Sequence, residues 1–327
     1  MFKNKNVLIT GGTGTWGQEL ARQLLKKGAK EIKIFSRNEA AQVEMRNKFG
    51  YNPNIIYIIG DVRDANSIKE SCWNIQYVFH TAALKHVTVC ENQPREAVET
   101  NIYGTQNVIN ACIDKKVEVC VNISSDKACY ANCFYGKTKA VAEGLITEAN
   151  NQTLDTDFIS IRSGNIFGSS GSVVPLWIRQ IKERNYIYVT GGNMRRFFIT
   201  VEDAVKATFR AMAMSDRGEI FVPKMDCFQI SDLAEILVKI YGNAKTEIRM
   251  AEAFPYERDN EWLLTPEESR RSVENKYFYV VYPLIDIKTA VYPVITDSNR
   301  LKNGIRMKGA KISGTEILWK LVKRAGY

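Results

Sequence analysis

The feature that most constrains the fold lies near the N-terminus, where a strand, a glycine-rich loop and a helix follow one another. Asn6–Thr10 is short and apolar, Gln18–Lys27 has helical periodicity, and the loop between them reads Gly-Gly-Thr-Gly-Thr-Trp-Gly. One glycine of such a loop makes a tight turn, a second lets the backbone approach a pyrophosphate, and a third permits close helix packing. A glycine loop alone could be an ordinary turn, but this context predicts a dinucleotide site at the helix N-terminus. The expected contacts are Gly11, Thr13, Gly14, Thr15, Trp16 and Gly17.

The end of the second predicted strand, Glu31–Phe35, indicates which dinucleotide is bound. NAD-binding proteins often place an acidic residue there for the ribose hydroxyls, whereas this chain has Ser36, Arg37 and Asn38. Arg37, assisted by its two neighbours, suits a ribose 2′-phosphate. We therefore expect NADP in preference to NAD, with a solvent-facing Arg37 as the alternative.

Two more short apolar strands, Ile55–Ile59 and Tyr77–His80, alternate with helical segments such as Ala97–Ala111. This alternation predicts an α/β fold built on a doubly wound parallel sheet. Asp61 could accept a hydrogen bond from an adenine amino group, although an aspartate at a strand end is as often a helix cap. Further cofactor contacts are expected at the ends of these strands, from Asp61, Val62, Ala82, Ala83 and Lys85.

The residues best suited to catalysis follow the predicted strand Val117–Ile123. Tyr135 and Lys139 lie one turn apart on a predicted helix, so both can face one site. A lysine cation beside a phenol lowers the tyrosine pKa, which would make Tyr135 a proton acceptor near neutral pH. A nicotinamide beside such a pair can oxidise a secondary alcohol to a ketone. Asp126 and Lys127 add an acid and a base that simple oxidation does not require, so elimination can follow.

Composition limits the classes of partner and compartment. The net charge is +9, but the basic residues are spread along the chain, which favours an anionic small molecule over a nucleic acid. Seven cysteines without a Cys-x-x-Cys pair fit reduced thiols, and the close pair Cys129 and Cys133 forms no recognisable metal pattern with the two histidines. There is no signal peptide or membrane-length apolar run, so we expect a cytoplasmic protein with no metal and no membrane contact.

The hydrophobic pattern changes after the strand Phe158–Arg162 and its small-residue loop. We expect a cofactor domain over residues 1–170, to which residues 197–225 return, and a substrate lobe formed by most of residues 171–327. Within this lobe, residues 194–200 form a basic and aromatic cluster suited to phosphates and a base, although an exposed arginine pair is the alternative.

Taken together, these segments resemble the extended short-chain dehydrogenase/reductase family, and within it the UDP-N-acetylglucosamine 4,6-dehydratases of the inverting, 5-epimerising type. The Ser-Asp-Lys-Ala element at Ser124–Ala128 is the most discriminating piece. The resemblance covers most of the chain and rests on Thr10–Gly17, Phe35–Glu39, His80–Val87, Thr100–Asn107, Ser124–Ala128, Tyr135–Lys139, Gly164–Gly168, Gly171–Pro175, Arg196–Thr200 and Gly218–Lys224.

The resemblance implies a role for each catalytic residue. Tyr135, activated by Lys139, removes the 4-hydroxyl proton, and Ser125 steadies the 4-keto oxygen. Lys127 then takes the C5 proton and Asp126 protonates the departing 6-hydroxyl. Asn101 is expected to order water or the lysine. The substrate, UDP-N-acetylglucosamine, is expected to contact Lys85, His86, Asn165, Val173, Arg196 and Arg258, and a homo-oligomer is expected.

Two segments depart from the family pattern. Ala131–Tyr135 replaces a Pro-x-x-x-Tyr loop, and Tyr256–Glu261 replaces Gly-Glu-Lys-Leu-His-Glu, which puts substrate contacts from that loop in doubt. The alternatives are a retaining dehydratase, a UDP-sugar 4-epimerase and a cofactor-sensing regulator on the same fold. Retaining relatives tend to lack the tyrosine, and regulators commonly lose the tyrosine or the lysine, whereas both are present here. The sequence leaves open the C5 outcome and the 2-substituent of the sugar.

Overall fold

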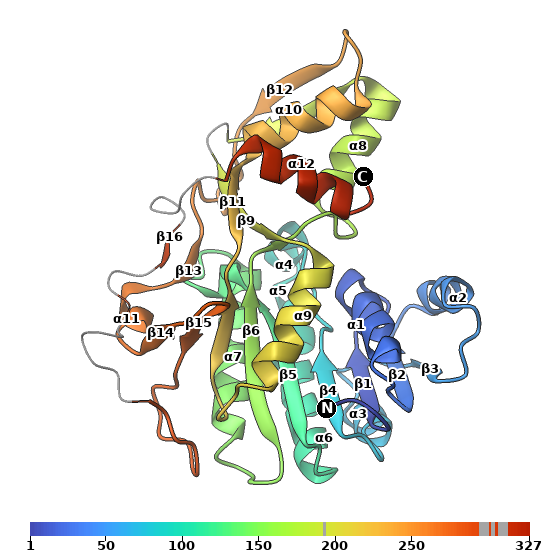
Figure 1. Cartoon of the computed structure of the whole chain (residues 1–327), viewed down its shortest axis with the longest axis vertical. Helices are drawn as coiled ribbons and strands as arrows, with labels where there is room; N and C mark the ends of the chain where they lie inside the picture. The colour runs from blue at the N-terminus through green and yellow to red at the C-terminus, as the bar shows by residue number, and fades with distance from the viewer. Residues whose placement is uncertain (192–193, 294–300, 302–304, 307–312) are drawn as a thin grey trace.

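The computed structural model of the chain describes residues 1–191, 194–293, 301, 305–306 and 313–327. Within that part of the chain, the largest element is a nine-stranded sheet (Figure 1). Its strands are β1 (Asn6–Thr10), β2 (Glu31–Ser36), β3 (Ile55–Ile59), β4 (Tyr77–His80), β5 (Val119–Ser125), β6 (Asp157–Ser163), β10 (Ile220–Pro223), β14 (Ser272–Glu274) and β15 (Phe278–Val281).

The strand order is β14-β15-β10-β6-β5-β4-β1-β2-β3. Every pair from β3 to β10 is parallel, while β15 and β14 pair antiparallel at the other edge. The chain runs outward from β1 to β3 and then returns to place β4 on the opposite side of β1. This reversal opens a crevice at the carboxyl ends of β1 and β4, where open α/β sheets bind ligands. The predicted doubly wound parallel sheet is confirmed.

Helices cover both faces of the sheet, so its central strands are buried on both sides. One face packs against α1 (Thr15–Lys26), α2 (Glu39–Lys48) and α9 (Val201–Met212). The other packs against α3 (Ala65–Ser71), α6 (Gly104–Asp114) and α7 (Phe134–Ala149). Successive side chains of β1 point to opposite faces of the sheet, so Val7 and Ile9 pack in the first core and Leu8 packs in the second.

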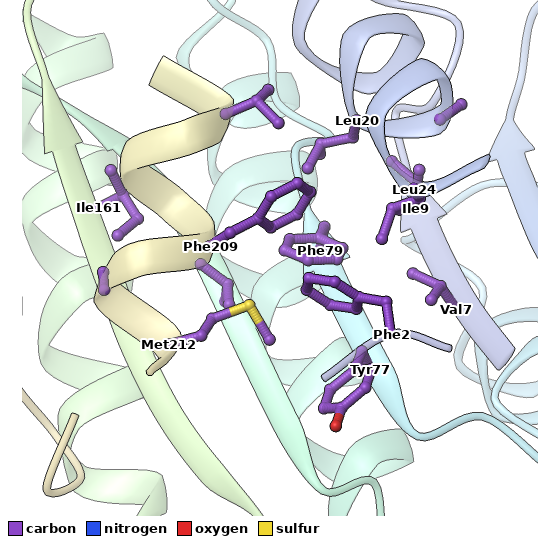
Figure 2. Packing of buried hydrophobic residues seen from close by; sticks show 14 of the residues in the cluster. Phe2, Val7, Ile9, Leu20, Leu24, Tyr77, Phe79, Ile161, Phe209 and Met212 are labelled. Atoms are coloured by element: carbon purple, nitrogen blue, oxygen red, sulfur yellow. The ribbon is translucent and has the colours of Figure 1, made fainter. Parts of the chain in front are cut away.

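Aromatic rings fill the first of these cores (Figure 2). Phe209 of α9 lies against Phe2 and Phe79, with ring centroids 4.6 and 5.8 Å apart. Leu20 and Leu24 of α1 close the cluster from the same face. Since α9 contributes to this core, a segment distant in sequence helps to bury β1 and β4.

Several helices that cover the sheet begin at capping side chains, and one predicted helix is interrupted. Asn38 accepts a hydrogen bond from the Ala41 amide at the start of α2, and Asp64 accepts from two amides at the start of α3. The predicted helix Ala97–Ala111 is in fact α5 (Pro94–Val98), a π-helical turn at Glu99–Tyr103, and α6. Such turns widen a helix locally and often lie at functional sites.

A second core lies beyond the carboxyl edge of the sheet. Its members include Phe167, Trp177, Phe198, Phe228 and Leu318. The elements around it are β7 (Asn165–Ile166), α8 (Val173–Arg184), β8 (Tyr186–Thr190), β9 (Arg195–Ile199), β11 (Asp226–Gln229), α10 (Ile230–Tyr241), β12 (Glu247–Ala251) and α12 (Thr315–Arg324). They form the upper part of the molecule in Figure 1.

Segments from the second half of the chain also return to the large sheet. They are α9 and β10, and additionally β14 and β15. The chain segments that connect elements of the two parts contain β13 (Trp262–Leu264), α11 (Pro266–Ser269) and β16 (Ile305–Arg306). The division at residue 170 stays a prediction. Among the described residues, no helix combines the length and apolarity needed to span a membrane.

Candidate functional site

A cavity of about 1150 Å³ opens at the carboxyl ends of β1, β2, β4, β5 and β6. The glycine loop and the ends of β2 and β3 line one part of it, and the end of β5 and the start of α7 line the middle. Residues of α8, β8 and the segment 251–261 line the remainder. The cavity therefore extends from the large sheet into the second part of the molecule, and it has room for two ligands of nucleotide size.

The glycine loop has a backbone that side chains would not permit. Gly11 has φ of 66°, and a Cβ there would lie 2.7 Å from the Ala82 amide nitrogen. A Cβ at Gly17 would lie 2.5 Å from Gly12 Cα, so α1 packs directly on the loop. Gly14 precedes α1 without a side-chain cap, and it lines the cavity together with Thr13, Thr15 and Trp16. The first amides of α1 thus stay available for an anion, a geometry that fits a dinucleotide pyrophosphate.

At the end of β2 the three expected ribose contacts have different surroundings. The Ser36 hydroxyl accepts a hydrogen bond from Gln42 at 3.1 Å, and the Asn38 carboxamide caps α2. Arg37 instead keeps a half-exposed guanidinium 3.6 Å from Asp61. Burial opposes ionisation of Asp61, but hydrogen bonds from Arg63 and the charge of Arg37 outweigh it and lower the pKa of the carboxyl. Of the three expected ribose contacts, Arg37 is thus the cation whose side chain could bind a phosphate.

Lys85 and His86 lie where the loop after β4 meets the loop before α8. The Lys85 ammonium donates to the Ser170 carbonyl at 2.6 Å, and burial lowers its pKa. Gly171 has φ of 72°, and a Cβ there would lie 2.9 Å from the His86 ring. Val62, Ala82, Ala83 and Val173 also line the cavity. These two loops therefore enclose the cavity between the predicted cofactor and substrate sites.

Ser125, Asp126 and Lys127 form a connected group at the end of β5. The Ser125 hydroxyl donates to Asp126 Oδ1 at 3.0 Å and also hydrogen-bonds Tyr135. Lys127 Nζ lies 3.6 Å from the same carboxylate oxygen. Asp126 is fully buried behind the cavity wall, and its Oδ2 has no hydrogen-bond partner among the described residues. Ser125 and Lys127 line the cavity, so they connect Asp126 to it.

The pKa expectation for Tyr135 is wrong for the protein alone. Burial raises the pKa of this phenol to about 12, although the Lys127 cation and the hydrogen bond with Ser125 act in the opposite direction. Burial also lowers the pKa of Lys139 to about 8, against the charge of Glu143. The reason is that desolvation penalises both charged forms inside the wall, and spacing along a helix carries no information about burial. Tyr135 and Lys139 do line the same cavity, as their spacing suggested.

The role predicted for Asn101, ordering a water or the lysine, stays a prediction, and the structure shows which protein groups this side chain contacts. Its side chain accepts from the Leu84 amide at 2.8 Å and donates to the Leu84 carbonyl and the Thr138 hydroxyl. It is 1% exposed and lies behind the cavity wall. The π-helical turn points Asn101 at the loop after β4, so the residue fixes that loop to α7.

The expected substrate contacts divide into two groups. Asn165 and Arg196 line the cavity, and Arg196 is held by the carbonyls of Arg195 and Asp259. Arg258 instead borders a separate small hollow with Tyr130 and Trp262. Arg258 is not among the residues that line the main cavity, and its contact with the substrate stays a prediction.

Glu261 lines the cavity, although sequence reasoning did not select it. It is 4% exposed, and its Oε1 lies 3.5 Å from Lys127 Nζ. One feature of the sequence could have identified it, because Glu261 matches the last residue of the family's Gly-Glu-Lys-Leu-His-Glu segment. The rest of Tyr256–Glu261 differs from that segment, which concealed the match.

The close cysteine pair is structural. The Cys133 sulfur accepts a hydrogen bond from the Gly136 amide at the start of α7, and Cys129 donates to Glu268 at 3.8 Å. Both thiols are buried, and burial raises both pKa values. Within the described ranges, no group of three His, Cys, Asp or Glu side chains is placed to hold a metal ion.

Comparison with known proteins agrees with this geometry. Residues 7–283 match the family described as "Polysaccharide biosynthesis protein". The UDP-N-acetylglucosamine 4,6-dehydratase (inverting) of Campylobacter jejuni is 36% identical over 95% of this chain and 91% of that protein. The UDP-glucose 4-epimerase of Rickettsia bellii is 40% identical over 85% of this chain and 83% of that protein. The X-ray structure of Pen from Bacillus thuringiensis has a TM-score of 0.91 at 39% identity, covering 99% of this chain and 98% of the other.

Proposed function

Since the chain belongs to the polysaccharide biosynthesis protein family, a group with nucleotide-sugar dehydratases and epimerases among its relatives, we propose that it is an inverting UDP-N-acetylglucosamine 4,6-dehydratase. Its product would be UDP-2-acetamido-2,6-dideoxy-L-arabino-hex-4-ulose. The observation that carries the proposal is the group at the end of β5. Ser125 and Lys127 line the cavity with Tyr135, and the buried Asp126 contacts both. An elimination after an alcohol oxidation needs an acid and a base beside the residues of the oxidation, and this group would supply them.

The glycine loop and the end of β2 support a nicotinamide dinucleotide as the cofactor. Gly11, Gly14 and the start of α1 would hold the pyrophosphate, and Arg37 would meet a ribose 2′-phosphate, which favours NADP. When bound, such a cofactor supplies the hydride acceptor for C4 and the hydride donor for C6.

Tyr135 is the residue placed to accept the 4-hydroxyl proton. Its phenol lines the cavity and hydrogen-bonds Ser125, whose hydroxyl can also steady the developing 4-keto oxygen. The phenol must release this proton before the next turnover, because the proposed product keeps its 4-keto group. Burial raises the pKa of the Tyr135 phenol in the protein alone. The proposed role therefore requires that bound cofactor and substrate lower this pKa.

Lys127 and Asp126 are placed for the elimination that the ketone makes possible. A 4-keto group acidifies the C5 proton, and the neutral Lys127 amine can take it. Asp126 supplies the proton for the departing 6-hydroxyl. Since Asp126 lies behind the wall, this proton reaches the substrate by rotation of the side chain or through Ser125 or Lys127, its two contacts on the cavity. Return of a proton to the opposite face of C5 gives inversion.

The remaining cavity supports an anionic, two-part substrate. Lys85 and Arg196 are cations on its wall, and His86, Asn165 and Val173 line other parts of it. A nucleoside diphosphate sugar has this charge and this division. The side chains favour no particular 2-substituent, so N-acetylglucosamine is proposed from the dehydratase relative.

A UDP-sugar 4-epimerase is the second candidate. Oxidation and re-reduction at C4 require only the Tyr135 and Lys139 pair, and the Rickettsia bellii relative carries that name. Such chemistry has no use for an acid and base connected to the same cavity, which is why the dehydratase is preferred. The non-enzymatic alternative is a cofactor sensor. A sensor would not need the acid, base and phenol of Asp126, Lys127 and Tyr135.

The test is incubation of the purified protein with NADP and UDP-N-acetylglucosamine, followed by NMR of the sugar. The proposal predicts a 6-deoxy-4-keto sugar, and Asp126→Asn and Lys127→Ala should each lower its formation by roughly a hundredfold or more while cofactor binding is kept. A 4-epimer as the sole product would favour the second candidate. An unchanged rate in both variants would refute the roles of the two residues.

A further inference from the structure

Lys127 lies between two carboxylates that are far apart in the sequence, Asp126 and Glu261. Its Nζ is 3.6 Å from Asp126 Oδ1 and 3.5 Å from Glu261 Oε1. Asp126 belongs to the large sheet, whereas Glu261 immediately precedes β13 in the segment that joins the two parts of the molecule. Both carboxylates are almost completely buried, so neither contact is a solvated surface pair.

The segment around Glu261 is fixed on both sides. Before it, the Asp259 carbonyl accepts from the Arg195 amide at 2.9 Å, and Asn260 forms a bridge with the same residue. After it, the Leu263 carbonyl accepts from Arg162 at 3.0 Å, and the Leu263 side chain is buried. Glu261 is therefore held at the Lys127 ammonium by the backbone and does not reach it from a free loop.

The other ionisable groups described near Lys127 are not carboxylates. Arg196 is a cation, Tyr135 is a phenol that burial keeps neutral, and the Cys133 thiol is also buried. Among the described residues, the two carboxylates are thus the main groups that favour the ammonium form of Lys127, and Tyr135 acts in the same direction to a smaller extent. Burial opposes the ammonium, yet the charges of Asp126 and Glu261 outweigh it and raise the pKa of Lys127.

We propose that Glu261 is a positioning residue of the acid/base site, which orients Lys127 and stabilises the ammonium that Lys127 becomes when it takes a proton from the substrate. The inference rests on the proposed function for that proton, and it adds a residue from the segment 256–261 to the group at the end of β5.

The proton balance of this arrangement is closed. At rest the group holds one ammonium and two carboxylates. Transfer of the ammonium proton to Asp126 gives a neutral amine and a neutral acid, which are the base and the acid of the elimination. When Lys127 takes the C5 proton and Asp126 gives its proton to the departing hydroxyl, the resting charges return. Glu261 exchanges no proton in this cycle, and its contact favours the protonated form of Lys127.

The test measures Lys127 directly and needs no substrate. Trace acetic anhydride acylates only the neutral amine, so labelling against pH, read by mass spectrometry of the Lys127 peptide, reports its protonation. In Glu261→Gln the pH of half-maximal labelling should fall, and Lys127 should label about tenfold faster at a given lower pH, the scale for losing one nearby opposite charge. Glu261→Asp keeps the charge and should stay nearer the wild type. The matched control is Glu274→Gln, which breaks an exposed ion pair with Lys224.

An unchanged labelling curve in Glu261→Gln would overturn the proposal. If the variant does not fold, the wild type decides: Lys127 must reach half-labelling at higher pH than the exposed Lys3 of the same protein, and an equal or lower pH overturns the proposal. In turnover of UDP-N-acetylglucosamine, Glu261→Gln should lose about tenfold in kcat with little change in KM, and the rise of kcat with pH should begin at lower pH. Failure of the wild type to dehydrate the sugar would refute the proposed function and leave the labelling result standing.

Discussion

Arg162 in β6 and Glu143 in α7 form a buried bidentate ion pair, with Nε–Oε1 of 3.0 Å and Nη2–Oε2 of 2.7 Å. Glu268 completes the group by accepting from the two terminal nitrogens of the same guanidinium at 2.8 and 2.7 Å. The pair joins a sheet strand to the helix that carries Tyr135 and Lys139. Through Glu268 it also joins both to the segment that carries Glu261.

Removal of this guanidinium should be costly. Arg162→Leu leaves Glu143 without its cation and leaves Glu268 only the longer contact with Arg271 at 3.9 Å, which is expected to lower the free energy of unfolding by about 3–5 kcal/mol. Urea denaturation measures this change. The control is Lys224→Leu, which removes an exposed partner of Glu274 and should cost under about 1 kcal/mol. Similar losses in the two variants would show that the buried group contributes no more than a surface pair.

Lys139 gives a pH dependence of stability. Burial lowers its pKa to about 8 from an ordinary value of 10.5, so between these values the unfolded chain binds more protons than the folded protein. Stability therefore rises with pH through this window. Lys139→Met should be more stable than the wild type below pH 8, by at most about 3 kcal/mol, and the difference should shrink toward pH 10.5. Denaturation curves over this range test it, and a variant less stable than the wild type at neutral pH would contradict the assigned burial cost.

Tyr135→Phe should abolish most turnover without loss of cofactor binding. The substitution removes only the hydroxyl that would accept the 4-hydroxyl proton, and a general base of this kind contributes roughly a hundredfold to ten-thousandfold. Turnover of UDP-N-acetylglucosamine and cofactor titration are the two measurements. Tyr51→Phe, which alters an exposed tyrosine outside the cavity, is the control. Wild-type turnover in Tyr135→Phe would assign proton transfer to another group.

Arg37→Ala should narrow the preference for NADP over NAD. Loss of charge-assisted hydrogen bonds to a 2′-phosphate is expected to weaken NADP by roughly tenfold to a hundredfold, while NAD binding changes little. Titration of both dinucleotides into both proteins measures the gap. Arg249→Ala, at an exposed pair with Glu247, is the control. Equal affinity of the wild type for the two dinucleotides would contradict the NADP assignment.

The sheet was largely predictable because its strands are short apolar runs buried on both faces. The predicted ranges of β1, β3 and β4 agree with the structure. The start of β5 was placed two residues early, since Val117 is apolar and buried but belongs to the turn after α6. The π-helical turn at Glu99–Tyr103 was not predicted, because its residues continue an ordinary helical pattern.

The candidate site was predictable where its residues are close in sequence. The glycine loop, the end of β5 and the start of α7 are local patterns, and the structure brings them to one cavity. Glu261 contacts Lys127 and Arg162 contacts Glu268, in each case across more than one hundred residues, and no local sequence pattern indicates such contacts. The pKa of Tyr135 also needed the fold, because burial decides it and burial depends on packing from α7 and β5 together.

The central claim is that Lys127 takes a proton from C5 and that a proton returns on the other face. The most direct measurement is turnover of UDP-N-acetylglucosamine by the wild type in deuterated water, with the sugar followed by NMR from the first turnovers. The account predicts deuterium at C5 and the L-arabino configuration, because a lysine exchanges its protons with solvent and the return is from the opposite face. A D-xylo product alone from the outset would contradict the inversion, and a 4-epimer without any 6-deoxy sugar would contradict the dehydratase itself.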